Sequence, residues 1–176
     1  MKFRDIPQIT QARYSVDVSW DYLKDDLERY DKNFGLILDP TYQRGYIWTE
    51  AQKVAYVEYK LRGGTSGGDI YWNCPGWMGK EMRNHPIEIV DGKQRLSAVV
   101  DFLDNKIPAF GLYRKDYEDK LHGLRPSFKY HVLDLKDRKE LLKWYIAMNT
   151  GGSAHTMVDL QPAFDELNKL ERETNG

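Results

Sequence analysis

The chain has 176 residues, of which 41% are hydrophobic, and its 26 lysine and arginine side chains nearly balance 27 aspartate and glutamate side chains. This length and apolar content suit one domain over residues 1–176 and exclude a chain that is disordered throughout. The near-neutral charge excludes a general attraction to nucleic acid or to an anionic membrane, so DNA contact requires a local basic patch.

Cysteine usage and hydropathy narrow the class of protein further. Cys74 is the only cysteine, so the chain forms no internal disulfide and is a poor candidate for a thiolate zinc site. No apolar run approaches the roughly 20 residues that a membrane-spanning helix needs. The N-terminal residues also lack the apolar segment of a signal peptide. We therefore expect a cytoplasmic protein without membrane contact.

The N-terminal part of the chain predicts a strand followed by an amphipathic helix. Residues 14–18 alternate in polarity as a half-buried strand does. Ser19 suits the N-cap of a helix that runs to about Tyr30. An apolar stripe along that helix indicates that it packs on the body of the domain.

An irregular segment separates this helix from the next one. Pro40 excludes a helix across the segment, and the second helix begins at Thr49, which has the glutamine of a capping box three residues later. Gln43 and Arg44 therefore lie in a non-helical connection. Since neither has a reason to be buried, we expect both to face a ligand. For Trp48, in the same connection, we favour a role as a plug in the core.

The remaining elements are predicted from periodicity or from short apolar runs. Apolar residues spaced by three, four and seven predict the central helix, from Lys93 to Leu103. The other predicted elements are strands at 69–73, 87–90, 109–113 and 128–135, and helices from 137 to about 148 and over 158–173.

The turn between the strand at 87–90 and the central helix has the outline of an anion site. Gly92 permits a backbone conformation closed to other residues, and the first amides of a helix have no partners within it. A helix N-terminus carries roughly half a positive elementary charge, and Lys93 and Arg95 add two full charges, which favours phosphate. The alternative is a tight turn with solvated charges, in which Asp91 caps the helix and Arg95 pairs with Asp101 or another nearby acid.

A glycine pair follows the helix that is predicted to end near Met148. Asn149, Gly151 and Gly152 break the helical pattern there. Paired glycines at this position usually form a C-cap. They also allow backbone amides to approach a ligand, and the pattern leaves both interpretations open.

Three motifs occur in a fixed order along the chain: Tyr42-Gln43-Arg44 followed by Tyr46 and Trp48, then Val90-Asp91-Gly92-Lys93-Gln94-Arg95-Leu96, and then Asn149-Thr150-Gly151-Gly152. Together they resemble the N-terminal domain family of the GmrSD-type restriction endonucleases, which belongs to the ParB/sulfiredoxin-like superfamily. The resemblance covers roughly residues 36–155. One departure is Lys93, which stands where the family usually has glutamine and which should tighten phosphate contact.

The resemblance implies an α/β fold in which helices flank a small mixed β-sheet. It also implies a nucleoside triphosphate as ligand or substrate, together with Mg²⁺ or another divalent cation. The catalytic residues that it implies are Asp91, Arg95 and Arg44, with Asp91 holding the metal ion or orienting the attacking water. The implied nucleotide or phosphate contacts are Gln43, Arg44, Gly92, Lys93, Gln94, Arg95, Asn149, Gly151 and Gly152.

Two functions follow from the resemblance. The first is a nucleoside triphosphate hydrolase related to the domain that couples hydrolysis to DNA cleavage in the restriction enzymes. The second is a non-catalytic module that binds DNA or a protein of a restriction, anti-restriction or partition system. The restriction enzymes carry a further module with a His-Asn-His type metal site, which this sequence lacks. We therefore expect no independent cleavage by that route, and expect DNA and a separate nuclease or defence-system protein as further partners.

Overall fold

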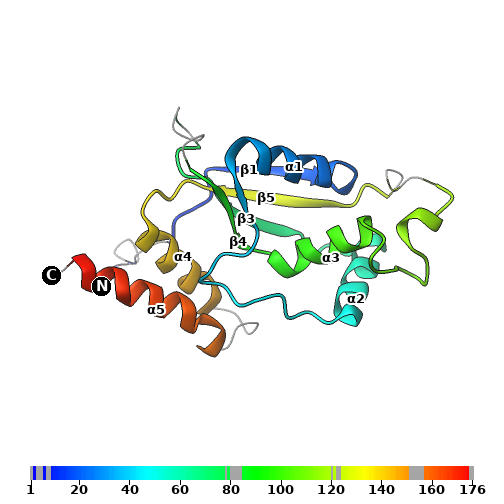
Figure 1. Cartoon of the computed structure of the whole chain (residues 1–176). Helices are drawn as coiled ribbons and strands as arrows, with labels where there is room; N and C mark the ends of the chain where they lie inside the picture. Colours follow the sequence, from blue (N-terminus) through cyan, green and yellow to red (C-terminus); the bar gives the residue numbers. More distant parts are fainter. Residues whose placement is uncertain are drawn as a thin grey trace.

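Five strands form one mixed sheet in the order β1-β5-β3-β4-β2 (Figure 1). The computed structural model describes residues 2, 6, 9–77, 79, 85–119, 121, 124–150 and 157–174. The strands are β1 (Tyr14–Ser19), β2 (Leu36–Ile37), β3 (Asp69–Asn73), β4 (Ile87–Asp91) and β5 (Ser127–Leu133). The β1/β5 and β3/β4 pairs are antiparallel, whereas β3/β5 and β2/β4 are parallel. The mixed sheet confirms the expected α/β fold.

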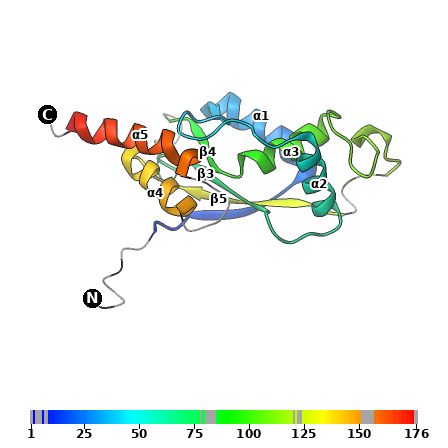
Figure 2. The ribbon, with the colours of Figure 1, turned by 90° about the horizontal axis from the view of Figure 1, so that it is seen from below.

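The helices pack on both faces of the sheet (Figures 1 and 2). They are α1 (Leu23–Phe34), α2 (Glu50–Leu61), α3 (Lys93–Leu103), α4 (Arg138–Thr150) and α5 (Met157–Thr174), with short 3-10 turns at Trp20–Tyr22 and Arg114–Asp116. Side chains of α1, α2 and α3 share one apolar cluster with Ile70 and Ile89. Side chains of α4 and α5 share a second cluster with Val90, whose side chain points to the opposite face of β4. No helix in the described part of the chain is long and apolar enough to cross a membrane.

Of the two predicted helix starts, the one at Thr49 is confirmed, whereas α1 begins only at Leu23, after a 3-10 turn. The Thr49 hydroxyl accepts from the Gln52 amide, and the Gln52 side chain accepts from the Thr49 amide, so the capping box opens α2 as expected. Ser19 accepts a hydrogen bond from the Asp21 amide, but it caps the 3-10 turn that precedes α1. The helix α1 then runs beyond its predicted end, to Phe34, because the chain first turns away at Gly35, where φ is +74°.

Two other predictions need correction. The predicted strand at 109–113 is wrong, because only an isolated bridge joins Ala109 to Leu112, around a turn in which Phe110 has a positive φ. The strand β5 ends at Leu133, two residues early. Beyond Leu133, hydrogen bonds from the Asn73 side chain take the place of strand pairing. The Asn73 side-chain oxygen accepts from the Leu135 amide at 2.9 Å, and its nitrogen donates to the Leu135 carbonyl oxygen at 3.1 Å.

Candidate functional site

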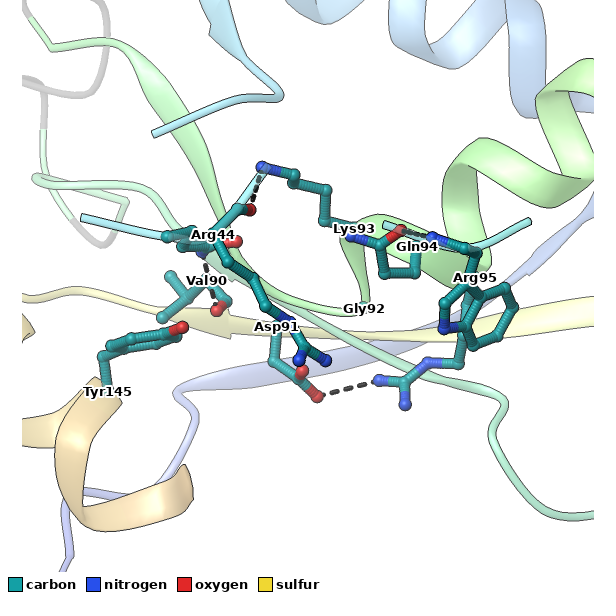
Figure 3. A pocket seen from close by; sticks show the side chains of 10 residues that line it. Arg44, Val90, Asp91, Gly92, Lys93, Gln94, Arg95 and Tyr145 are labelled. Atoms are coloured by element: carbon teal, nitrogen blue, oxygen red, sulfur yellow. Dashed lines mark hydrogen bonds and ion pairs between the residues drawn. The ribbon is translucent and has the colours of Figure 1, made fainter. Parts of the chain in front are cut away.

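A pocket with a volume of about 140 Å³ lies where β4 passes into α3 (Figure 3). The connection before α2, the turn from β4 into α3, and the helix α4 all contribute to its wall. The lining residues are Gln43, Arg44, Trp48, Val90, Asp91, Gly92, Lys93, Gln94, Arg95 and Tyr145. The structure thus brings every predicted site residue of the first two motifs into one pocket.

Gly92 forms the turn because no other residue fits there without strain. Its φ of +99° lies in the left-handed region. A Cβ at this position would also lie 2.4 Å from Ile70 Cδ1 and 3.3 Å from the Asp69 carbonyl oxygen. Among the residues that the structure describes, no side chain caps α3. The amides of its first turn are therefore open at the pocket, with the partial positive charge of the helix N-terminus.

Two arginines from separate segments, Arg44 and Arg95, line the pocket together with Asp91. Arg95 donates to Asp91 Oδ2 at 2.8 Å and to the Asp69 carbonyl oxygen at 2.9 Å. Arg44 forms an ion pair with Asp159 Oδ2 at 3.0 Å. Figure 3 marks the contact of Asp91 with Arg95 and shows Arg44 as a further side chain of the pocket. The pocket therefore places two guanidinium groups beside the open end of α3, and Asp91 pairs with Arg95 instead of capping the helix.

Lys93 directs its ammonium group to the connection that carries Arg44. Its side chain is 4% exposed, and the ammonium donates to the Asp39 carboxylate and, at 2.7 Å, to the Arg44 carbonyl oxygen. It also lies 4.7 Å from the centre of the Tyr46 ring. Figure 3 shows the group pointing away from Asp91. Lys93 thus tethers this connection to α3, and its predicted phosphate contact stays a prediction.

Gln43 and Trp48 fix the two ends of the same connection. The Gln43 amide donates to the carbonyl oxygens of Ile89 and Val90 at 2.7 and 2.9 Å, which holds it on β4. The Trp48 ring is half-buried and meets the Tyr56 ring edge-on, with centroids 5.4 Å apart. Trp48 therefore packs on the core, as expected, and also forms part of the pocket wall.

Gln94 holds the connection against the first turn of α3. Its side-chain oxygen accepts from the amides of Ile47 and Trp48 at 3.1 and 3.2 Å, and its nitrogen donates to the Gly45 carbonyl oxygen at 2.9 Å. The amide group of a glutamine suits a ligand and a backbone segment equally well. In this structure the amide of Gln94 binds the backbone, and its predicted contact with a nucleotide stays a prediction.

Replacing Gln94 with alanine should lower the free energy of unfolding by about 1 kcal/mol, because three backbone groups lose a protein partner and return to water. Urea unfolding measures this change. The control is Gln161→Ala, since the exposed Gln161 side chain bonds a neighbouring carboxylate, that of Asp165, on α5. Equal stability changes in the two variants would show that Gln94 does not hold the connection.

Tyr145 of α4 also lines the pocket. Burial raises the pKa of Tyr145 to about 12; the Arg44 guanidinium opposes this rise, and the carboxylates of Asp91 and Asp159 add to it. The phenol therefore keeps its proton at neutral pH and can donate a hydrogen bond to an anion. Its helical spacing matches an ordinary core residue, so no sequence signal marks it.

The third motif is only partly described by the structure. Asn149 lies inside α4, where it is buried and donates to the Tyr145 carbonyl oxygen at 2.7 Å. It is not among the residues that line the pocket. Gly151 and Gly152 lie outside the described residues. The nucleotide contacts predicted for these three residues stay predictions.

The described residues contain no group of three or more His, Cys, Asp or Glu side chains that could hold a metal ion. Asp91 offers one carboxylate at the pocket. Magnesium in nucleotide sites takes one or two carboxylates and completes its shell with phosphate and water oxygens. Asp91 therefore fits a divalent ion that arrives with a nucleotide.

Comparison with known proteins gave one family match. A family model described as the N-terminal domain of the GmrSD restriction endonuclease matches residues 23–131, which is more than half of the chain. No curated protein and no solved structure gave a match. The matched range includes the segment with Arg44 and the turn at Gly92, but not α4 or α5.

Proposed function

We propose that this chain, which belongs to the family of GmrSD restriction endonuclease N-terminal domains, binds a nucleoside triphosphate at the start of α3 and hydrolyses it. Family membership links the chain to restriction enzymes. The observation that supports nucleotide binding is the presence of Arg44 and Arg95 in one pocket, beside helix amides that no side chain caps in the described structure.

In this proposal the phosphate chain lies across the first turn of α3. The amides of Lys93 and Gln94 donate to phosphate oxygens, as amides at a helix N-terminus commonly do. Arg44 and Arg95 add charge-assisted hydrogen bonds from the two sides of the pocket, and a guanidinium matches the geometry of a phosphate group well. The neutral Tyr145 phenol supplies one further donor.

Binding requires an exchange of partners, because the pocket cations already pair with carboxylates of the chain. Arg95 pairs with Asp91 and Arg44 with Asp159, and these four side chains are between 22% and 34% exposed. Partly exposed ion pairs contribute little free energy. Phosphate oxygens can therefore replace the carboxylates at small cost, while the buried Lys93 continues to hold the connection.

The same exchange would prepare Asp91 for catalysis. Once Arg95 turns to the phosphate, the Asp91 carboxylate is available to hold a divalent cation or to orient the attacking water. When bound, the cation would neutralise charge on the phosphate oxygens and polarise the phosphoryl group. Arg44 and Arg95 would stabilise the charge that develops on the transferred phosphoryl group.

Calorimetric titration tests the binding step of the proposal. We expect a non-hydrolysable nucleoside triphosphate with Mg²⁺ to bind, and the affinity to fall stepwise for the diphosphate and the monophosphate, because each phosphate removed loses charge-assisted contacts. The unphosphorylated nucleoside serves as the control and should not bind measurably. Equal affinity for the nucleoside and the triphosphate would show that the phosphate chain is not what the pocket recognises.

Family membership also supports a second proposal, that the domain acts together with DNA or a separate nuclease protein. The chain has near-neutral charge, and the pocket cations are paired, so we expect weak direct binding to DNA. A filter-binding titration against salt tests this, because neutralisation of DNA phosphates gives a steep negative slope. A steep slope with tight binding would favour the DNA-binding function over the nucleotide-dependent one.

A further inference from the structure

The ion pair between Arg44 and Asp159 joins the pocket to the last helix of the chain. Arg44 Nη1 lies 3.0 Å from Asp159 Oδ2, and each side chain is 22% exposed. Asp159 belongs to the first turn of α5, which lies outside the family-matched range 23–131. The helix α5, which lies beyond the matched range, therefore places the Asp159 carboxylate against the Arg44 guanidinium of the proposed phosphate site.

The rest of α5 holds this anion in place. Leu160 is buried, and Glu166 accepts hydrogen bonds from Arg138 at 2.7 Å and from Thr41 at 3.4 Å. Pro162 lies inside the helix and has no N–H group to donate to the turn before it. The body of α5 is thus anchored, while its first turn has one fewer helical hydrogen bond holding it.

We propose that Asp159 is an internal competitor for the phosphate site, and that a bound triphosphate takes Arg44 from it and loosens the first turn of α5. This inference rests on the proposed function. A carboxylate and a phosphate are both acceptors for a guanidinium, so an anion bound at Arg44 meets repulsion from Asp159. Because coupling is reciprocal, a change that removes the Asp159 charge and keeps Arg44 must strengthen binding of the anion.

The affinity test uses Asp159→Asn, which removes the charge and keeps the shape of the side chain. We expect this variant to bind inorganic triphosphate and a non-hydrolysable nucleoside triphosphate about fivefold more tightly than the unmodified chain. The matched control is Asp165→Asn, which removes the same charge from an exposed position on the same helix, and should leave the affinity unchanged. Unchanged or weaker binding by Asp159→Asn would overturn the inference, and weaker binding would instead make Asp159 a contributor to the site.

Hydrogen exchange tests the loosening of α5 by a separate route. Saturation with the non-hydrolysable triphosphate should speed exchange of the amides of Gln161, Ala163 and Phe164, which donate to carbonyl groups of the first turn of α5. Without ligand, both Asp159→Asn and Arg44→Ala should show the faster exchange already; the second variant keeps the favourable carboxylate at the helix start. Unchanged exchange in both variants would overturn the inference.

The two tests separate this inference from the function on which it rests. If the unmodified chain binds triphosphate, and Asp159→Asn binds it equally well, only the competition by Asp159 is wrong. If neither protein binds triphosphate, the proposed function itself is wrong, and so is the proposed competition by Asp159. If Asp159→Asn binds and the unmodified chain does not, both are supported, because the internal carboxylate then blocks the site.

Discussion

Replacing Asp91 with asparagine is expected to lower phosphate release from nucleoside triphosphates about a hundredfold, the usual scale for the loss of a group that positions a proton or a water in the reaction. Nucleotide binding should persist or become tighter, because the neutral amide side chain would no longer repel phosphate or compete for Arg95. The variant should therefore separate turnover from affinity, with a reduced kcat and an unchanged or reduced KM.

The measurement is phosphate release from each of the four common triphosphates in the presence of Mg²⁺, beside calorimetric binding of a non-hydrolysable analogue. Asp26→Asn is the matched control, because Asp26 pairs with Arg29 one helical turn away on α1, outside the pocket. Turnover by the Asp91 variant at the rate of the unmodified chain would remove Asp91 from the mechanism. An unmodified chain that binds triphosphate and releases no phosphate would leave only a binding function.

Replacing Arg95 with alanine is expected to weaken binding of a non-hydrolysable triphosphate at least tenfold, which is the loss of one charge-assisted contact of about 1.4 kcal/mol. The variant also leaves Asp91 without its arginine partner beside the phosphate chain, which adds repulsion to the lost contact. Calorimetry measures the affinity, and circular dichroism verifies that the variant is folded.

Two further variants decide whether the effect of Arg95 is local. Arg29→Ala breaks an equivalent arginine–aspartate pair on α1 and should leave the affinity unchanged. Combining Arg95→Ala with Asp91→Asn should recover part of the lost affinity, because the orphaned carboxylate is then replaced by a neutral amide. Unchanged affinity in a well-folded Arg95→Ala protein would contradict the proposed role of this arginine.

The parts of the fold that sequence patterns predicted are those that local chemistry determines. The capping box uses only the side chains and amides of Thr49 and Gln52, which are three residues apart. Gly92 is required by the positive φ of one turn. The segment at 109–113 was mispredicted because a short run of apolar and aromatic residues resembles a strand, whereas Phe110 and Gly111 adopt positive φ. The two residues of β2 are too few to show any period.

The candidate site was predictable only where its residues stand in short motifs. Arg44 and the residues from Asp91 to Arg95 are such cases, and the structure brings them together. Tyr145 and Asp159 reach the site through the packing of α4 and α5 on the other face of the sheet, which no local pattern encodes. The hydrogen bonds of Gln94 to the backbone were not predictable either. A side-chain amide has one donor group and one acceptor atom, and these suit a ligand as well as a backbone segment.

The open amides at the start of α3 are central to the proposed function, and a crystal structure with a non-hydrolysable triphosphate and Mg²⁺ tests them most directly. We expect phosphate oxygens within hydrogen-bond distance of the Lys93 and Gln94 amides, with Arg44 and Arg95 turned from their carboxylates to the phosphate chain. A triphosphate bound elsewhere, with both ion pairs intact and the amides still open, would contradict the proposed function.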